Sequence, residues 1–156
     1  MIRKFQDSDV EKMLDIWLSG SKQAHNFVPK EYWQKMVPSV RKYYLPNTES
    51  YVFEDKHQVK GFVSTIDDKY IGALFVDPKY QKQKIGSKLI NYVKNMHPEL
   101  SLKVFTKNKD ALRFYQKNGF KIMSEQTDEG TKEQELLLSW SMECKTGYYK
   151  RYPSDS

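Results

Sequence analysis

The sequence predicts an α/β fold of the α+β kind, with a mixed, mostly antiparallel sheet of about seven strands and about four helices. Two observations support this fold class. Three strand-like runs joined by tight turns occupy the middle of the chain, which is typical of an antiparallel meander. On either side, apolar residues recur at helical spacing between shorter strand-like runs, which gives the order β-α-α-β-β-β-α-β-α-β-β. The 156 residues fit one domain with a real core.

The first third of the chain is expected to hold a short strand and two helices. Residues 1–5 form the strand, and Ser8 with Glu11 matches a capping box at a helix start. The helix is expected to bury an apolar stripe and to end at 19-SGS-21. Pro29 can open a second helix, which a later proline interrupts.

The remaining elements follow from alternation, helical spacing and turn residues. The meander comprises strands 50–55, 58–66 and 70–76. The elements expected after it are a helix over 85–96, a strand over 100–105, a helix over 108–118 and strands over 120–125 and 134–142. Asn108 can cap the second of these helices, and Gly119 can end it in a left-handed conformation.

Charge and cysteine content limit the possible functions. The chain has 26 basic and 20 acidic residues, a formal charge of +6, which suits a polyanionic ligand. Nucleic acid is the obvious rival, but the lysines are spread along the chain, which disfavours it. The single Cys144 excludes an intramolecular disulfide and gives no metal-binding pattern. Without a signal peptide or a long apolar run, we expect a cytoplasmic protein that does not enter membranes.

The stretch 76-VDPKYQKQKIGSKLI-90 suggests an anion site. An apolar strand leads into a loop rich in lysine and glutamine, and a helix begins near Ile85. Unpaired N–H groups and the helix dipole favour an anion at such a start, and Gly86 allows close approach of the backbone. The alternative is a solvated lysine-rich turn.

A second stretch, 108-NKDALRFYQKNGF-120, makes the sequence similar to the GNAT superfamily of acyl-CoA-dependent N-acyltransferases. It resembles the family motif N-x-x-A-x-x-F/L-Y-x-x-x-G-F. The first stretch resembles the pyrophosphate loop R/Q-x-x-G-x-G/A, from Gln81 to Gly86, with Lys82 and Lys84 where glycines are usual. The resemblance covers residues 1–142 and leaves 143–156 as a tail. It implies a GNAT fold, splayed between strands 4 and 5.

The resemblance implies acetyl-CoA as co-substrate and no metal. Pantetheine would lie in the splay and pair with the backbone of Leu74, Phe75 and Val76, with an oxyanion-type N–H near Phe75. The pyrophosphate would be held by Gln81, Lys82, Gln83, Lys84, Ile85, Gly86 and Ser87. Further cofactor contacts are expected from Asn108, Ala111, Phe114 and Lys117.

Tyr115 is the expected catalytic residue. The thiolate that leaves when an amine attacks a thioester needs a proton, and a phenol within hydrogen-bond reach can supply one. Ala111, four residues earlier, shares its helix face and leaves room beside the cofactor. The alternative is a tyrosine packed in the core. Direct transfer in a ternary complex is preferred to a covalent route through Cys144, which has no paired base in the sequence.

The acceptor is expected to be a primary amine. The segments "IWLSGSKQAHNFVPKEYW" and "LLSWSM" are similar to bacterial YiaC/YjaB-type acetyltransferases, some of which acetylate protein lysines. The expected acceptor-binding residues are His25, Phe27, Tyr32, Trp33 and Tyr70, although the aromatic ones could instead fill the core. The general base stays open between His25, Asp67 and a water chain. Alternative functions are acetylation of aminoacyl-tRNA or of small amines, and a non-catalytic acyl-CoA-binding module. The sequence does not give the oligomeric state.

Overall fold

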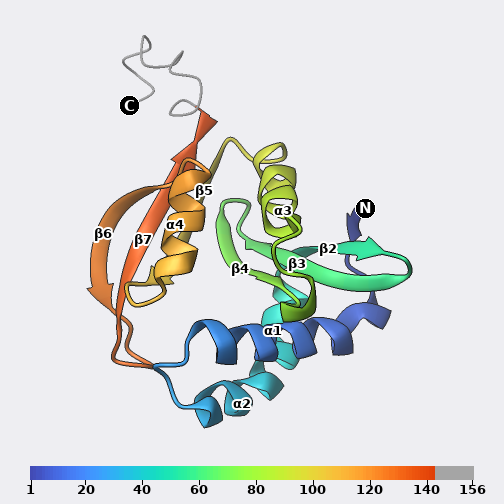
Figure 1. Cartoon of the computed structure of the whole chain (residues 1–156), viewed down its shortest axis with the longest axis horizontal. Coiled ribbons are helices and arrows are strands. Elements are labelled where there is room, and N and C mark those ends of the chain that lie inside the picture. The colour runs from blue at the N-terminus through green and yellow to red at the C-terminus, as the bar shows by residue number, and fades with distance from the viewer. Residues whose placement is uncertain (143–156) are drawn as a thin grey trace. The chain divides into compact units, whose positions relative to one another are not determined.

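The computed structural model describes residues 1–142, which form two compact units, one from Met1 to Val93 and one from Lys94 onward (Figure 1). The predicted tail, 143–156, and its Cys144 lie outside the described residues. Within residues 1–142 the order of strands and α-helices is the predicted one. No helix there combines the length and the apolar character that crossing a membrane requires.

The first unit is built on an antiparallel four-stranded sheet in the order β1-β2-β3-β4. Its strands are β1 (Ile2–Lys4), β2 (Glu49–Asp55), β3 (Gln58–Ile66) and β4 (Tyr70–Val76). The two hairpin turns carry positive φ angles at Lys56, His57, Asp67 and Asp68. Two successive left-handed residues give the turn twist that suits a tight hairpin. The predicted meander is therefore confirmed, without a glycine in either turn.

Helices cover both faces of this sheet. The α-helices are α1 (Val10–Ala24), α2 (Lys30–Ser39) and α3 (Ile85–Lys94), with short 3-10 segments at Asp7–Asp9, Leu45–Asn47 and Pro78–Tyr80. A β-carbon on Gly20 of α1 would touch the Phe75 ring of β4, and one on Gly61 of β3 would touch Ile85 and Leu89 of α3. Phe75 pairs with Phe62, the residue next to Gly61 on β3. Successive residues of a strand point to opposite faces of a sheet, so Phe75 and Gly61 face opposite sides. Helices α1 and α3 therefore lie on opposite faces of the sheet.

Helix α1 differs from the prediction at its end. It does not end at 19-SGS-21 but continues to Ala24. Gly20 is not a helix stop: its missing side chain lets α1 approach β4, since a β-carbon there would lie 2.4 Å from the Phe75 Cδ1 atom. The glycine therefore serves packing between helix and sheet.

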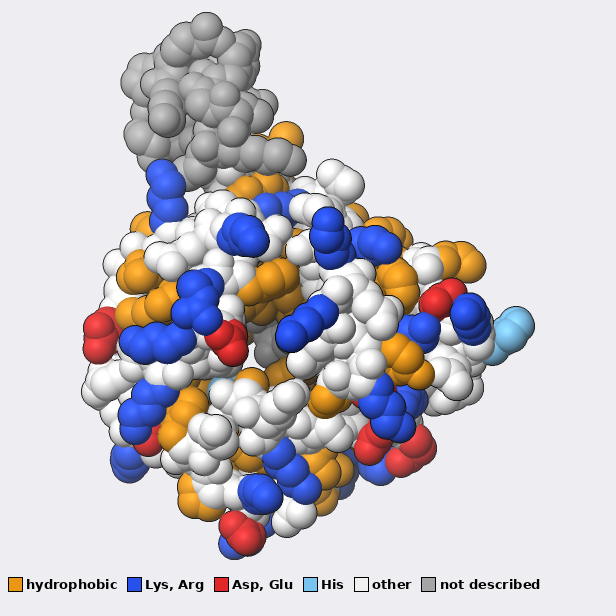
Figure 2. All heavy atoms as spheres, in the orientation of Figure 1, with side chains coloured by type: hydrophobic (Ala, Val, Ile, Leu, Met, Phe, Trp, Pro, Cys, Tyr) orange, Lys and Arg blue, Asp and Glu red, His pale blue; other side chains and the backbone are white. Residues whose placement is uncertain are grey.

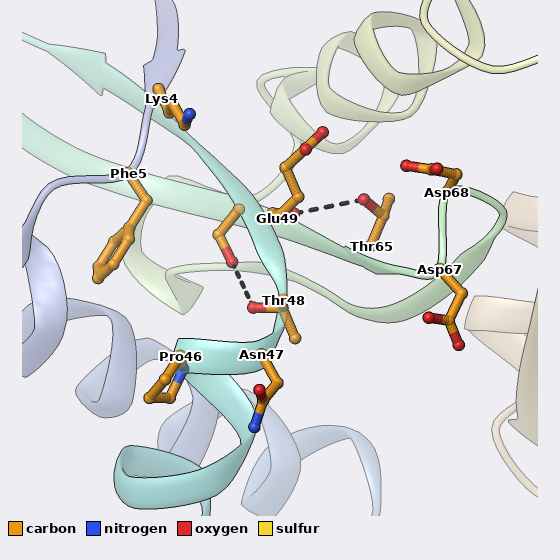
Figure 3. Close-up of a pocket in the computed structure, with 10 residues that line it drawn as sticks. Lys4, Phe5, Pro46, Asn47, Thr48, Glu49, Thr65, Asp67 and Asp68 are labelled. Carbon is orange, nitrogen blue, oxygen red and sulfur yellow. Dashed lines mark hydrogen bonds between the residues drawn. The ribbon is translucent and has the colours of Figure 1, made fainter.

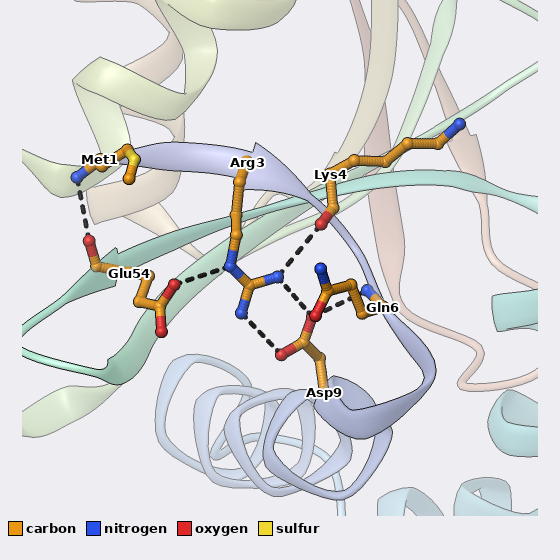
Figure 4. Close-up of polar contacts among 6 residues, drawn as sticks. All are labelled: Met1, Arg3, Lys4, Gln6, Asp9 and Glu54. Atoms are coloured by element: carbon orange, nitrogen blue, oxygen red, sulfur yellow. Dashed lines mark hydrogen bonds and ion pairs between the residues drawn. The ribbon is translucent and has the colours of Figure 1, made fainter.

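The start of α1 also differs from the predicted box of Ser8 and Glu11. The observed box lies at the 3-10 segment before α1 and joins Gln6 and Asp9, with the Gln6 N–H donating to Asp9 Oδ2 at 2.8 Å. The Arg3 guanidinium donates twice to the buried Asp9, at 2.9 Å each, and once to Glu54 at 2.7 Å (Figure 4). A bidentate pair of this kind fixes both position and orientation. It ties β1 to the start of α1 and to β2.

After α2 the chain forms a five-residue π-helical turn, Val40–Tyr44. Pro38, inside α2, has no N–H to donate, so the regular i→i−4 pattern is broken close to this point. The sequence indicated an interruption here, and the structure shows that it takes the form of a wider turn. This turn presents Tyr44 toward β4, where a β-carbon on Gly72 would lie 2.1 Å from the Tyr44 hydroxyl.

The second unit has an antiparallel three-stranded sheet in the order β5-β7-β6 and one α-helix. Its elements are β5 (Glu99–Phe105), α4 (Lys109–Lys117), β6 (Lys121–Thr127) and β7 (Gln134–Ser141). The core of this unit includes Leu100, Leu102, Phe120, Leu138 and Trp140. The predicted splay between strands 4 and 5 concerns how the two units meet, and it stays a prediction.

Candidate functional site

The loop between β4 and α3 has an unusual backbone. Lys82 and Lys84 have φ angles of 69° and 63°, in the left-handed region that favours glycine. Gln83 between them does not share this conformation. Alternation of this kind turns successive N–H groups toward one concave side, which is a common way to hold an anion. The two lysines therefore adopt the backbone that glycine would adopt more easily.

Helix α3 begins directly after this loop, at Ile85. The Ile85 side chain is 2% exposed, so it anchors the helix in the core and only its backbone can meet a ligand. Gly86 and Ser87 are half-buried in the first helical turn, whose N–H groups have no intrahelical partners. The exposed side chains of Gln81, Lys82, Gln83 and Lys84 surround this start. The arrangement fits a pyrophosphate in both charge and donor supply.

Contacts from other elements hold the beginning of the loop in place. The buried Asp77 accepts a bond from the Lys79 N–H at 3.0 Å and pairs with Lys12 Nζ of α1 at 3.2 Å. The Tyr80 hydroxyl donates to Gln58 of β3 at 2.7 Å, and Lys60 lies 4.4 Å from the Tyr80 ring centre. Sequence analysis missed these positioning contacts, although the Asp-Pro pair before the loop is a common turn signal.

Strand β4 carries the residues expected to meet pantetheine. Leu74, Phe75 and Val76 are half-buried and pair with β3. Upstream of them the register shifts: Ser64 pairs with Ala73, but Thr65 pairs with Ile71, so Gly72 is an extra residue that forms a bulge. Bulges bend a strand and are frequent next to active sites. The bulge was not predicted, because a lone glycine in a strand signals it only weakly.

In the second unit, α4 positions Tyr115 through caps at both ends. The Asn108 side chain accepts from the Ala111 N–H at 3.2 Å. At the other end the Phe120 N–H donates to Tyr115 O and the Gly119 N–H to Gln116 O, both at 3.0 Å, with Gly119 at φ 92°. These paired bonds form a Schellman motif, and they confirm the prediction that Gly119 ends the helix.

The Tyr115 side chain is half-buried between aromatic rings. Its ring centre lies 5.1 Å from that of Phe114 and 5.5 Å from that of Phe120, both in edge-to-face geometry. Burial raises the pKa of the Tyr115 phenol above its usual value, so the hydroxyl keeps its proton. Ala111 and Phe114 are half-buried on the same helix, whereas Lys117 is exposed.

The expected acceptor-binding residues form an aromatic cluster in the first unit. The ring centre of Trp33 lies 4.9 Å from that of Tyr32 and 5.2 Å from that of His25, and Phe27 lies 6.0 Å from His25. Trp33 is only 6% exposed, so it packs in the core. His25, Phe27 and Tyr32 are half-buried, as is Tyr70 at the start of β4. Burial lowers the pKa of His25 to about 4, which makes it a weak base.

A polar pocket of about 380 Å³ opens at one end of the four-stranded sheet (Figure 3). Glu49 lines it from β2, and Asp67 and Asp68 line it from the turn before β4. All three carboxylates are exposed, and Lys4 is the basic residue of the lining. Its other lining residues are Phe5, Pro46, Asn47, Thr48, Ser50 and Thr65. The net negative lining favours a positively charged group.

Two further observations concern metal ligands and basic side chains in the described residues. Within residues 1–142 no group of three or more His, Cys, Asp or Glu side chains is placed to hold a metal. On the face shown in Figure 2, the Lys and Arg side chains are scattered among acidic, polar and hydrophobic ones. A protein that follows a nucleic-acid backbone usually gathers its basic side chains into a patch or stripe.

Comparison with known proteins gives consistent matches. Residues 9–135 match the family described as Acetyltransferase (GNAT) domain. The chain is 36% identical to peptidyl-lysine N-acetyltransferase YiaC of Escherichia coli K12, over 90% of this chain and 96% of YiaC. It is 31% identical to peptidyl-lysine N-acetyltransferase YjaB of the same organism, over 78% of this chain and 82% of YjaB.

Solved structures agree with these matches. The solution structure of apo YjaB from E. coli has a TM-score of 0.79 and covers 90% of this chain and 96% of its own, at 29% identity. The PaiA N-acetyltransferase of Thermoplasma acidophilum, solved with coenzyme A, has a TM-score of 0.77 at 20% identity, over 90% of this chain and 98% of its own. The second likeness concerns the fold alone.

Proposed function

The chain belongs to the GNAT family of acetyltransferases, which take their acetyl group from acetyl-CoA, and we propose that it acetylates the side-chain amine of protein lysines. The observation that carries the choice of acceptor is the 36% identity to YiaC, which is named a peptidyl-lysine N-acetyltransferase, over nine-tenths of the chain. The carboxylates of Glu49, Asp67 and Asp68 support it, because they favour a positively charged acceptor segment.

The donor is bound, on this proposal, by the β4–α3 loop and by β4. The concave N–H groups around Lys82 and Lys84 receive the pyrophosphate together with the first turn of α3. The backbone of Leu74, Phe75 and Val76 pairs with the pantetheine arm, and an N–H near Phe75 polarises the thioester carbonyl. The ion pair of Asp77 and Lys12 holds the start of the loop against α1.

The reaction is direct transfer in a ternary complex. The lone pair of the neutral lysine amine forms a bond to the thioester carbonyl carbon, whose π electrons move to the oxygen. When the carbonyl re-forms, the carbon–sulfur bond breaks and the thiolate leaves. Tyr115 donates its phenolic proton to the sulfur, because a phenol carries its proton at neutral pH and can pass it to a thiolate within hydrogen-bond reach.

The amine must also lose protons. A free lysine has a pKa of about 10.4, so most of the acceptor arrives charged. With a pKa of about 4, His25 takes up a proton poorly at neutral pH. Asp67 is exposed, which places it in contact with solvent. The proposed route therefore leads to bulk water, through a chain of water molecules past Asp67.

The test is incubation of the protein with labelled acetyl-CoA and a bacterial cytosolic lysate, followed by mass spectrometry of the products. We expect label on the side-chain nitrogen of protein lysines, and a rate that rises with pH as more amine becomes neutral. Label confined to aminoacyl-tRNA or to small amines would overturn the lysine acceptor. A failure of acetyl-CoA to raise the melting temperature would favour a chain that no longer binds the donor.

A further inference from the structure

The Tyr44 hydroxyl is a buried polar group that the proposed mechanism does not use. It has no hydrogen-bond partner among residues 1–142. Protein interiors leave few polar atoms in this state, because an unmade hydrogen bond costs free energy. Tyr44 therefore calls for an explanation by function or by a ligand.

The location of this hydroxyl links it to β4, the strand on which the proposed function places the thioester. A β-carbon built on Gly72 would lie 2.1 Å from Tyr44 Oη and 3.0 Å from Cζ, and one of its next neighbours would be Cδ1 of Ile66. The hydroxyl thus lies directly over the bulge of β4, where glycine alone leaves room for it. Any side chain at Gly72 would displace it.

The bulge lies at the end of β4 away from the loop that receives the pyrophosphate. Gly72 is four residues before Val76, or about 13 Å at roughly 3.3 Å per strand residue. A pantetheine arm that runs back along β4 from the loop brings its thioester toward this bulge. The inference therefore rests on the proposed function for the direction of the donor.

The element that carries Tyr44 is itself unusual. The π-helical turn Val40–Tyr44 is wider than an α-helix, and such turns are rare and frequent at functional sites. Tyr43 in the same turn points outward and is 61% exposed, whereas the Tyr44 hydroxyl is buried. The turn thus directs one of two adjacent tyrosines toward β4.

We propose that the Tyr44 hydroxyl binds the acceptor amine and orients it for attack. A neutral phenol has two lone pairs that can accept a hydrogen bond from an amine N–H. With one N–H held by Tyr44, the nitrogen lone pair is free to face the thioester carbonyl. Burial, and secondly the nearby Tyr70, raise the pKa of Tyr44, so it binds the amine without removing its proton.

The test compares Tyr44→Phe with Tyr43→Phe, which removes an exposed hydroxyl from the adjacent residue. The probe is Nα-acetyl-lysine methylamide, a lysine side chain with both backbone ends blocked. We expect Tyr44→Phe to lower kcat/KM for this amine about tenfold, the loss typical of one hydrogen bond. The KM for acetyl-CoA should stay unchanged, and Tyr43→Phe should match the wild type in both.

Stability separates this role from packing. Removal of an unpaired buried hydroxyl leaves the midpoint of urea unfolding unchanged or raises it. A fall in the midpoint, with equal losses for amine and acetyl-CoA, would make Tyr44 a packing residue and overturn the proposal. Gly72→Ala should displace the hydroxyl and lower kcat/KM for the amine, and adding Tyr44→Phe to it should cost little more.

A binding measurement keeps the inference distinct from the lysine proposal. With coenzyme A bound, which carries no acetyl group, n-butylamine binding to the wild type and to Tyr44→Phe is compared by titration calorimetry. Weaker binding to the variant supports the inference even if no protein lysine is acetylated. Equal binding, or none to either protein, would overturn it, and the acetylation of lysine would then be judged by the lysate experiment alone.

Discussion

Lysine occupies both left-handed positions of the β4–α3 loop, where the resemblance to the GNAT superfamily leads to an expectation of glycine. The φ angles of 69° at Lys82 and 63° at Lys84 show that the backbone adopts the glycine-like conformation despite the side chains. Such a conformation costs a residue with a β-carbon on the order of 1–2 kcal/mol. The loop therefore retains its shape and gains two positive charges beside the expected phosphates.

The strain and the charge can be separated by paired substitutions. Lys82→Gly and Lys82→Ala both remove the charge, but only glycine relieves the left-handed strain. We expect the glycine variant to be more stable than the alanine variant, by on the order of 1 kcal/mol in urea unfolding. Both should bind acetyl-CoA more weakly than the wild type at low salt, in a calorimetric titration. Equal stability of the two variants would mean that the backbone at this position relaxes.

The hydroxyl oxygen of Tyr115 is the atom that distinguishes a catalytic role from a purely structural one. Its ring packs edge-on against Phe114 and Phe120, which is sufficient for a purely structural tyrosine. Its carbonyl accepts a hydrogen bond of the Schellman motif, so its backbone is held without the hydroxyl. Only the hydroxyl can supply a proton, and its removal leaves these packing contacts in place.

Tyr115→Phe should therefore lower kcat by roughly 10²–10⁴-fold, the range typical of one general acid. The affinity for acetyl-CoA and the melting temperature should change little, because the lost interaction matters mainly in the transition state. Single-turnover measurements at saturating acetyl-CoA would separate chemistry from product release. A wild-type chemical rate in this variant would show that Tyr115 only packs.

At the scale of elements, the close contact between α1 and β4 helps to position β4, the strand expected to pair with pantetheine. Gly20 lies within α1, where glycine is about 1 kcal/mol less favourable than alanine. The structure explains this choice, because a β-carbon would approach the Phe75 ring to 2.4 Å. The helix accepts a weaker propensity so that it can pack closely on the strand.

Gly20→Ala should consequently destabilise the protein although it favours the helix. Overpacking typically costs about 1–3 kcal/mol. The gain in helix propensity from glycine to alanine is about 1 kcal/mol, so the net effect is expected to be destabilising. The urea midpoint measures the net effect. Combining Gly20→Ala with Phe75→Leu, which removes the facing ring, should cost less than the sum of the two changes. Strict additivity would indicate that the helix does not need this close approach.

At the scale of the described molecule, the buried His25 and the paired Asp9 are two groups that make stability depend on acid. Burial lowers the pKa of His25 to about 4, so the unfolded chain binds a proton more readily than the folded chain. Stability from this group is complete above about pH 6.5 and falls as the pH drops toward 4. The Arg3 hydrogen bonds hold the pKa of Asp9 below its usual range. The stability that this pair contributes is therefore lost only at still lower pH.

His25→Gln should flatten the loss of stability between about pH 6.5 and 4 and leave the lower-pH loss from Asp9 in place. His57→Gln is the matched control, because His57 lies exposed in the β2–β3 turn. Urea midpoints measured across this pH range test the expectation. The same slope in His25→Gln and in the wild type would assign the acid sensitivity to another group.

The sequence by itself determined the order of elements, the two motifs and the caps of α4, because these depend on residues close along the chain. Alternation, helical spacing and the Asn108 and Gly119 signals are local, and the structure confirms each of them. The family also followed from local motifs, and residues 9–135 confirm it.

Only the tertiary structure decided the features that join distant segments. The continuation of α1 through Gly20 goes with its close fit against Phe75, and the anchoring of the segment before α1 depends on Arg3 reaching Asp9 and Glu54. The bulge at Gly72 and the position of Tyr44 above it likewise have no local signal of sufficient strength. In each case the free energy of packing between separate elements outweighs a local preference, and a local pattern does not contain that term.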